Sequence, residues 1–184
     1  SHSLLIPMPA IQEITEKLIC DNIHRAVHDV FKTMLQKEPN FVSAQVQPAG
    51  VHTPSMQPGA EGNQAHVVGT VGFIGDVNGL IYLYFDLGFA RLATSHLLGM
   101  NDAELNEAGD EVINDAIGEL TNMTVGSFKN GLCDAGYPCK LTIPSILRGS
   151  NFCVEPISSA SRHTFFFTCA GHRVVTDILM KIGD

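Results

Sequence analysis

Two short apolar runs, at residues 66–74 and 80–85, constrain the fold of this 184-residue chain more than any other feature. Both runs are rich in β-branched and aromatic residues, and the five residues between them end in Asn78-Gly79. Asn-Gly between two such runs is a strong signal for a β-hairpin, because both residues tolerate a positive φ. The pattern therefore predicts a hairpin that turns at Asn78-Gly79.

Other patterns surround this hairpin with helices and further strands. Apolar residues at helical spacing indicate helices over residues 9–37, 87–99 and 102–130. Alternating or short apolar runs indicate strands over residues 41–47, 140–146, 151–154, 163–169 and 174–180. Helices come early, strands are grouped late, and there is no regular strand–helix–strand alternation. The chain is therefore predicted to be α+β, with a mostly antiparallel sheet packed with two long helices.

Length and composition indicate a single domain over residues 1–184. With 45% hydrophobic and 16% charged residues, the chain is too apolar to be disordered and long enough to bury a core. Residues 48–63 contain three prolines and three glycines, so we expect an exposed loop there. We expect residues 1–8 to be flexible or vector-derived.

Net charge and hydropathy argue against nucleic-acid binding and against membrane insertion. The net charge is −8, from 11 Lys and Arg against 19 Asp and Glu, and no basic stripe is visible that could bind nucleic acid. No apolar stretch approaches the ~18 to 20 residues of a membrane-spanning helix, and the first residues do not resemble a signal peptide. Five scattered cysteines favour reduced thiols. The sequence thus predicts a cytoplasmic protein without membrane insertion.

Common catalytic and metal-binding signatures are missing. The sequence has no GxxxxGK phosphate loop, no GxSxG nucleophile elbow and no HExxH helix. Cys20, His24 and His28 share one helix face, but the first and last would be ~12 Å apart along the axis, too far for one metal ion. Cys133 and Cys139 lack the tight CxxC spacing of zinc sites. We therefore predict no metal site.

One face of the predicted helix 102–130 carries polar residues that could take part in catalysis or binding. At 3.6 residues per turn, one narrow strip holds Asp115, Glu119, Asn122 and Gly126. The opposite side, which is expected to face the core, holds Ile113, Ile117, Leu120, Thr124 and Phe128. Glu119 and Asn122 are three residues apart, so their side chains project next to each other. A solvated polar face would look the same, so the pair alone does not establish a site.

The same predicted helix contains glycines, which are unfavourable inside a helix. Gly109, Gly118 and Gly126 lie inside the predicted helix, where each costs ~1 kcal/mol relative to Ala. Three such costs suggest that something approaches the backbone closely. Because Gly126 lies one turn beyond Asn122, a partner could lie against the strip there.

Residues 115–126, DAIGELTNMTVG, resemble the phosphatase signature of the CheC/CheX/FliY family of chemotaxis proteins. In that family an acidic or Ser residue precedes the Glu by four positions, Glu-x-x-Asn follows, and a Pro comes about 22 residues later. Asp115, Glu119 and Asn122 fit, and Pro144 follows after 21 intervening residues. The long first helix, the hairpin and Leu98-Gly99-Met100 before the signature fit as well.

The copy number of the signature narrows the resemblance within the family. CheC carries two copies and CheX one, and the first helix here has none, so the chain resembles CheX. A second Glu-x-x-Asn pair, Glu111 and Asn114, lacks the preceding Asp-Ala-Ile-Gly and is assigned no role.

The resemblance implies a phosphatase that acts on the aspartyl phosphate of a CheY-like response regulator. It implies that Asn122 positions the attacking water and that Glu119 pairs with the regulator's active-site Lys. Asp115 and Gly126 would help to bind the partner. Mg²⁺ is expected on the regulator, so the chain would need no cofactor of its own.

Assembly and an alternative function complete what the sequence predicts. Members like CheX pair as homodimers through their sheets, so a homodimer is expected. The alternative is a non-catalytic interaction module that binds a response regulator or a flagellar switch component, since a fold does not fix its function. The intact pair of Glu119 and Asn122 favours the phosphatase, because a docking domain has no need of that carboxamide.

Overall fold

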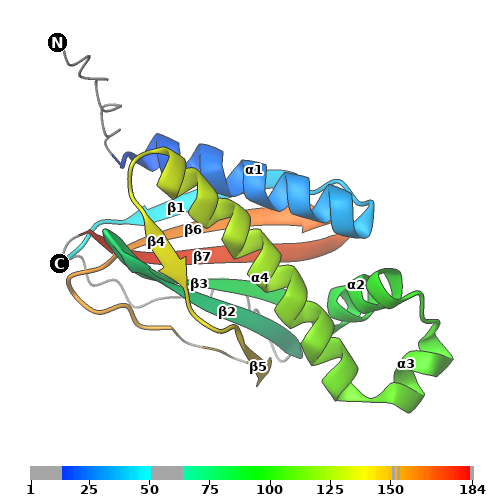
Figure 1. Cartoon of the computed structure of the whole chain (residues 1–184). Helices are drawn as coiled ribbons and strands as arrows, with labels where there is room; N and C mark the ends of the chain where they lie inside the picture. The colour runs from blue at the N-terminus through cyan, green and yellow to red at the C-terminus, as the bar shows by residue number, and fades with distance from the viewer. Residues whose placement is uncertain (1–13, 51–63, 151, 153, 183–184) are drawn as a thin grey trace, which may run out of the picture.

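Helices cover one face of a seven-stranded sheet in the computed structural model, which describes residues 14–50, 64–150, 152 and 154–182 (Figure 1). All strand pairs are antiparallel, in the order β1-β6-β7-β3-β2-β4, and β5 also pairs with β2. The predicted α+β class is confirmed. The elements in chain order are α1 (Glu16–Leu35), β1 (Asn40–Gln47), β2 (His66–Gly75), β3 (Val77–Asp86), α2 (Leu87–Leu98), α3 (Asp102–Ala108), α4 (Asp110–Asp134), β4 (Cys139–Leu141), β5 (Ser145–Gly149), β6 (Ser161–Cys169) and β7 (His172–Ile182).

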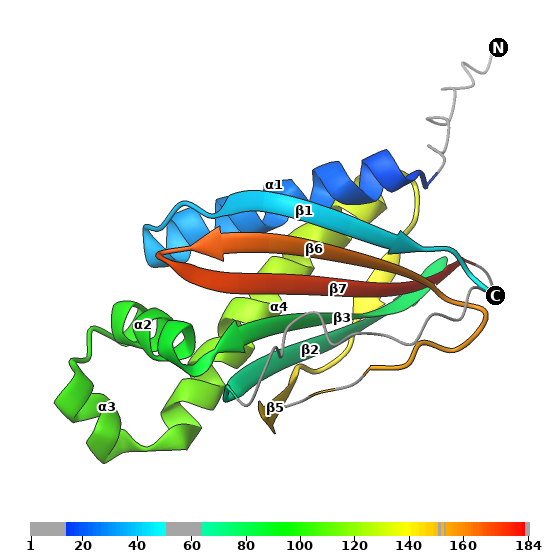
Figure 2. The same cartoon turned by 180° about the vertical axis from the view of Figure 1, so that it is seen from behind.

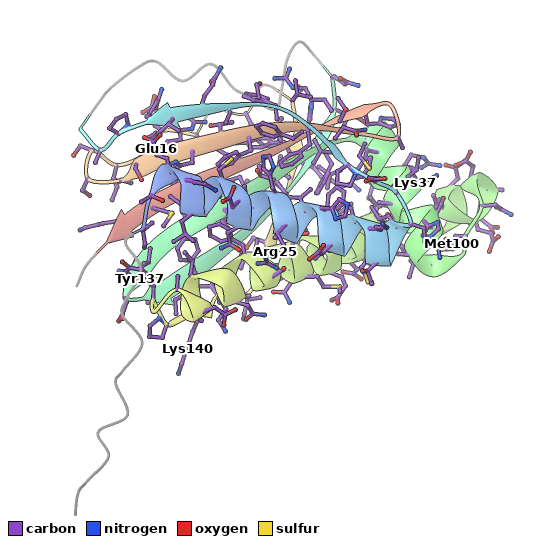
Figure 3. All side chains as sticks on the ribbon, turned by 90° about the horizontal axis from the view of Figure 1, so that it is seen from above. Glu16, Arg25, Lys37, Met100, Tyr137 and Lys140 are labelled. Atoms are coloured by element: carbon purple, nitrogen blue, oxygen red, sulfur yellow. The ribbon has the colours of Figure 1, made fainter. Side chains whose placement is uncertain are left out.

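The two long helices, α1 and α4, lie side by side on the sheet (Figure 3). Alternate residues of the central strands face them and form the main core; on β3 these are Ile81, Leu83 and Phe85. Arg25 of α1 joins the helices by donating to the Ser127 hydroxyl (3.0 Å) and to its carbonyl (2.9 Å). The two helices and the sheet therefore form one continuous hydrophobic core.

The predicted helix over residues 102–130 is in fact two helices. Asn101 and Glu104 form a capping box that begins α3. Gly109 then adopts φ +83° and ψ −174°, a left-handed extended conformation that no helix can contain and that glycine reaches without a steric penalty. The prediction of Gly109 inside a helix was wrong, and α4 begins after it as a separate element.

The predicted hairpin between β2 and β3 is confirmed, but its turn is not at Asn78-Gly79. The last paired residues are Phe73 and Gly79, so the chain turns through residues 74–78. Asn78 lies in β3, where its side chain accepts a hydrogen bond from the Gly75 amide (3.0 Å). Neither Asn78 nor Gly79 has a positive φ. Glycine is needed at position 79 for space instead, because a Cβ there would overlap the Leu179 carbonyl and the Phe73 ring.

The remaining helices and strands agree with those predicted from the sequence, except in the segment after α4. The structure confirms the strands predicted over residues 41–47, 163–169 and 174–180, and the helices predicted over 9–37 and 87–99 within the described residues. The strand predicted over 140–146 is divided into β4 and β5, and no strand is present at Phe152 or Val154. Residues 151 and 153, residues 1–8 and residues 51–63 of the predicted loop lie outside the described residues.

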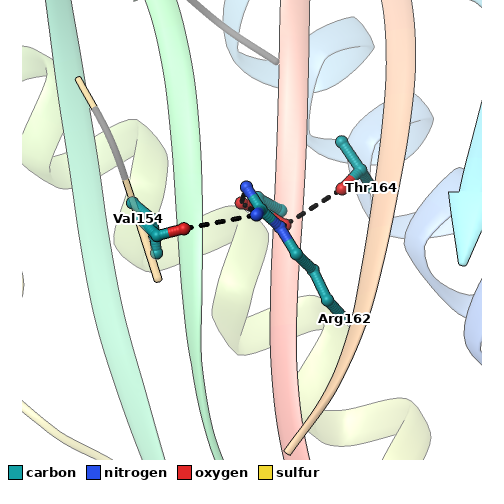
Figure 4. Close-up of polar contacts among 4 residues, drawn as sticks. Val154, Arg162 and Thr164 are labelled. Carbon is teal, nitrogen blue, oxygen red and sulfur yellow. Dashed lines mark hydrogen bonds and ion pairs between the residues drawn. The ribbon is translucent and has the colours of Figure 1, made fainter. Parts of the chain in front are cut away.

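The outer face of the sheet, which Figure 2 shows from the side away from the helices, has its own small core of Val68, Tyr84, Phe166 and Val175. An almost fully buried ion pair lies beside it: Arg162 is 4% exposed and Asp177 0%, and their closest contact is 2.7 Å. The Thr164 hydroxyl donates to Asp177 (3.1 Å), and Arg162 also donates to the Val154 carbonyl (3.2 Å), as Figure 4 shows. These bonds hold the segment after β5 against the sheet, on the face opposite α4.

The contact between Gly69 of β2 and Thr121 of α4 determines how closely α4 approaches the sheet. A Cβ added at Gly69 would lie 2.8 Å from the Thr121 Cβ, well inside van der Waals contact. Thr121 is fully buried, and its hydroxyl donates to the Ile117 carbonyl (2.7 Å), so its side chain cannot turn away without losing that bond. Gly69 therefore allows α4 to sit directly on β2.

We predict that Gly69→Ala lowers the free energy of unfolding by about 2 kcal/mol, because the added methyl group overpacks the contact with Thr121. Gly118→Ala is the matched control on α4. Its added Cβ would meet nothing closer than Ile146 at 3.9 Å, so it should raise stability by up to about 1 kcal/mol. Urea denaturation of the three proteins measures both changes, and a Gly69→Ala protein as stable as the wild type would contradict this packing.

Candidate functional site

The strip predicted on α4 faces outward. Ile113, Ile117, Leu120, Thr124 and Phe128 are all buried on the opposite side, as the helical spacing predicted. Asp115 and Glu119 are exposed, and Asn122 and Gly126 are half-buried. The four residues of the predicted site therefore lie together along one accessible side of a helix that is fixed to the core.

Glu119 and Asn122 are free to engage a partner. Among the described residues, no hydrogen bond or ion pair involves either side chain. A polar group held in internal hydrogen bonds would have to break them before it could bind elsewhere, at a cost of about 1 kcal/mol or more for each bond. These two groups need no such rearrangement.

The second Glu-x-x-Asn pair is different, because Asn114 is engaged internally. The Asn114 carboxamide oxygen accepts a hydrogen bond from the Arg148 Nε at 2.5 Å. Arg148 also donates to the Asp110 carbonyl (3.3 Å) and lies 3.6 Å from the Asp110 carboxylate. Arg148 thus links β5 to the first turns of α4, and sequence reasoning missed this role because nothing local to Arg148 signals it.

The glycines of α4 divide into two kinds. Gly131, which the sequence analysis did not single out, is needed by the fold: a Cβ there would overlap the Asn22 carboxamide of α1. At Gly118 and Gly126 a Cβ would make only ordinary contacts, with Ile146 at 3.9 Å and Leu141 at 3.8 Å. Internal packing therefore does not explain glycine at positions 118 and 126, which leaves a partner's approach as a reason for them.

The histidine and cysteine candidates pack as ordinary side chains. The His24 ring lies 4.0 Å from the Phe41 ring, and burial lowers the pKa of His24. Burial raises the pKa of Cys139 to about 11, which keeps that thiol protonated and a poor metal ligand. Within residues 14–50, 64–150, 152 and 154–182, no group of three His, Cys, Asp or Glu residues could hold a metal ion.

No helix in the described part of the chain is long and apolar enough to cross a membrane.

Comparison with known proteins identifies the family. The family model of the chemotaxis phosphatase CheX matches residues 67–168, which is more than half of the chain and includes the whole strip on α4. The chain belongs to the CheX family. The resemblance seen in the signature of residues 115–126 is thereby confirmed, whereas no curated protein matches the sequence.

Solved structures share the CheX fold at low sequence identity. A CheC-like superfamily protein from Shewanella sp. PV-4 has a TM-score of 0.72 and 21% identity, with 91% of this chain and 99% of that chain covered. Chemotaxis protein CheX from Vibrio vulnificus has a TM-score of 0.71 and 22% identity, with 89% and 99% covered. The CheX–CheY–BeF₃–Mg²⁺ complex from Borrelia burgdorferi matches with a TM-score of 0.65 and 21% identity, with 89% and 97% covered.

We predict that Glu119→Ala and Asn122→Ala leave the free energy of unfolding unchanged or raise it by a few tenths of a kcal/mol. Neither side chain has a partner among the described residues to lose, and Ala is the better helix former. Asn114→Ala should instead lower it by about 1 kcal/mol, because Arg148 loses its acceptor. Thermal and urea denaturation test this difference, and a marked loss of stability in Asn122→Ala would show that the residue serves the fold.

Proposed function

We propose that this protein dephosphorylates the aspartyl phosphate of a CheY-like response regulator by inserting Glu119 and Asn122 into the regulator's active site. The observation that carries the proposal is the accessible strip of α4, where a carboxylate and a carboxamide project side by side and have no hydrogen-bond or ion-pair partner among the residues that the structure describes. Membership of the chemotaxis phosphatase family supports the reaction class. The CheX–CheY–BeF₃–Mg²⁺ complex from Borrelia burgdorferi supports the class of partner.

The charges on α4 indicate which of the two proteins neutralises the phosphoryl group. Residues 115–126 include Asp115 and Glu119 but no Lys or Arg, so the strip has no cation to neutralise a phosphoryl group. That charge must be neutralised on the regulator, by its bound Mg²⁺ and its active-site Lys. The CheX-like chain then needs no cofactor of its own, and its contribution is to position a water molecule.

Asn122 has the chemistry to hold that water in line with the phosphorus. A carboxamide both accepts and donates hydrogen bonds, so it orients a water molecule without removing its proton. A water molecule that is already oriented loses less freedom when the transition state forms, so the barrier to the reaction is lower. Because Asn122 lies on a helix that packs against the sheet, the helix holds its side chain in a defined position.

Glu119 and the ends of the strip would fix the helix in the regulator's site. The exposed Glu119 carboxylate is one turn before Asn122 and would pair with the regulator's active-site Lys. Asp115, one turn earlier, would add a polar contact, and Gly126, one turn beyond Asn122, would let the partner's surface approach the backbone. CheY-like response regulators act in the cytoplasm, so we propose that this protein is cytoplasmic too.

The decisive assay follows the decay of a phosphorylated response regulator from the same organism, charged with a small phosphodonor. We predict faster decay with the wild type, a loss of 10²-fold or more in Asn122→Ala, and a substantial loss in Glu119→Ala. Asn114→Ala is the matched control, with the same chemical change two turns away on α4, and should keep its rate constant within about twofold.

Three outcomes would contradict parts of this account. If no regulator loses its phosphate faster with the wild type, the non-catalytic interaction module replaces the phosphatase. If Asn122→Ala is as active as the wild type, the water-positioning role is wrong. If Asn114→Ala is as inactive as Asn122→Ala, activity depends on the shape of α4 in general.

We also propose that the protein forms a homodimer through the exposed edge of its sheet at β1. Within the described residues β1 pairs only with β6, so alternate residues of this eight-residue strand direct their backbone N–H and C=O groups to an edge without a partner strand. Apolar side chains accompany this edge: Phe41 is 43% and Val42 59% exposed. A long apolar edge strand invites pairing with a second strand unless something covers it.

We predict that Val42→Lys shifts a dimer of the wild type to monomer, because a lysine on the edge opposes strand pairing. Light scattering after size-exclusion chromatography measures the mass. Ile157→Lys, at an exposed apolar residue outside the strands, should leave the mass unchanged. A monomeric wild type would contradict the homodimer, and an unchanged dimer in Val42→Lys would move the interface away from β1.

A further inference from the structure

Ile143 is the most exposed large apolar side chain in the described part of the protein, with 88% of its surface accessible. It lies in the three-residue connection between β4 and β5. Single exposed apolar residues are common and need no explanation by themselves. The position of Ile143 relative to α4 makes it relevant to the site.

Two contacts place this connection beside Asn122. Leu141, just before it, lies against Gly126, and Ile146, just after it, lies against Gly118. Asn122 is midway between these two glycines, one turn from each. The connection therefore passes α4 at the level of Asn122, and Figure 1 shows β4 and β5, which it joins, alongside this helix.

The connection is held firmly in this position. Both Leu141 and Ile146 pack against the main core. Between them, the Thr142 amide donates to the Gly72 carbonyl (2.8 Å), and the Gly72 amide donates to the Thr142 hydroxyl (2.8 Å). Ile143 is thus an apolar side chain on a firmly held backbone, and little in the described part of the chain covers it.

We propose that Ile143 forms an apolar contact for the receiver domain of the response regulator, next to the point where Asn122 enters its active site. This inference rests on the proposed function, since the same docking event would bring the regulator against α4 and the connection beside it. The surface that fits Ile143 is an apolar patch at the rim of the regulator's acceptor site. A regulator with a charged residue at that place would be a poorer substrate, so Ile143 would contribute to the choice of partner.

The chemistry of the strip explains why such a contact is useful. The two exposed residues of the strip, Asp115 and Glu119, offer hydrogen bonds and charge, which in exposed positions give specificity more than affinity. Burial of an isoleucine adds affinity without competing for the water that Asn122 positions. The two kinds of contact are separable, because Ile143 takes no part in the chemical step.

The experiment compares steady-state dephosphorylation by the wild type, Ile143→Glu, Ile143→Leu and Ile157→Glu. We expect Ile143→Glu to raise KM about 10-fold with kcat within twofold, which is the pattern of lost binding that is equal in the ground and transition states. Ile143→Leu should behave as the wild type. Ile157→Glu makes the same change at a residue that is 66% exposed and lies outside the α4 region, and it should leave KM unchanged.

A binding measurement gives an independent readout. The regulator loaded with beryllofluoride and Mg²⁺ should bind Ile143→Glu about 10-fold more weakly than the wild type and bind Ile157→Glu equally well. An active wild type with KM and affinity unchanged in Ile143→Glu would overturn the inference and leave the phosphatase intact. A wild type that neither dephosphorylates nor binds any regulator would overturn both.

Discussion

The close contact of α4 with the sheet is the interaction on which the rest of this structure depends. Gly69 has no side chain, and the buried Thr121 occupies the space that a Cβ would need. That contact sets how closely the buried face of α4 approaches the sheet, while the opposite side of the helix remains accessible. The neighbouring residue in the sequence is Asn122, so a packing contact in the core and the position of the proposed catalytic group are directly coupled.

A rigid platform suits a protein whose proposed task is to place one side chain inside another protein. The helix is supported on three sides, by β2 below it, by α1 through Arg25 and Ser127, and by Arg148 from β5. Polar groups that serve the fold, such as Asn114 and Thr121, are engaged in internal hydrogen bonds. Glu119 and Asn122 have no such bonds within the described residues, which is the expected arrangement for groups that act on a partner.

Periodicity allowed most of this architecture to be predicted from the sequence, because helical and strand patterns depend on residues close together in the chain. The buried face of α4, the hairpin of β2 and β3, and the strands β6 and β7 were predicted in this way. The accessible strip followed from the same argument, since a helix with one apolar face must expose the opposite one.

The predictions that failed concern features set by contacts between distant residues. Gly79 is required by Leu179 and Phe73, not by a turn, and the predicted strand 140–146 is interrupted where Thr142 bonds to Gly72. The engagement of Asn114 by Arg148 joins residues 34 positions apart, so no local pattern could separate this pair from Glu119 and Asn122. Gly109 is a partial exception, since a glycine between two helical runs could have been read as a break.

The most direct test of the central claim is a crystal structure of this protein bound to a response regulator loaded with beryllofluoride and Mg²⁺. The account predicts that the Asn122 carboxamide lies within about 3 Å of a water molecule in line with the acyl phosphate mimic, with Glu119 paired to the regulator's Lys. A complex in which α4 stays outside the regulator's active site, or in which Asn122 faces away from the mimic, would contradict it.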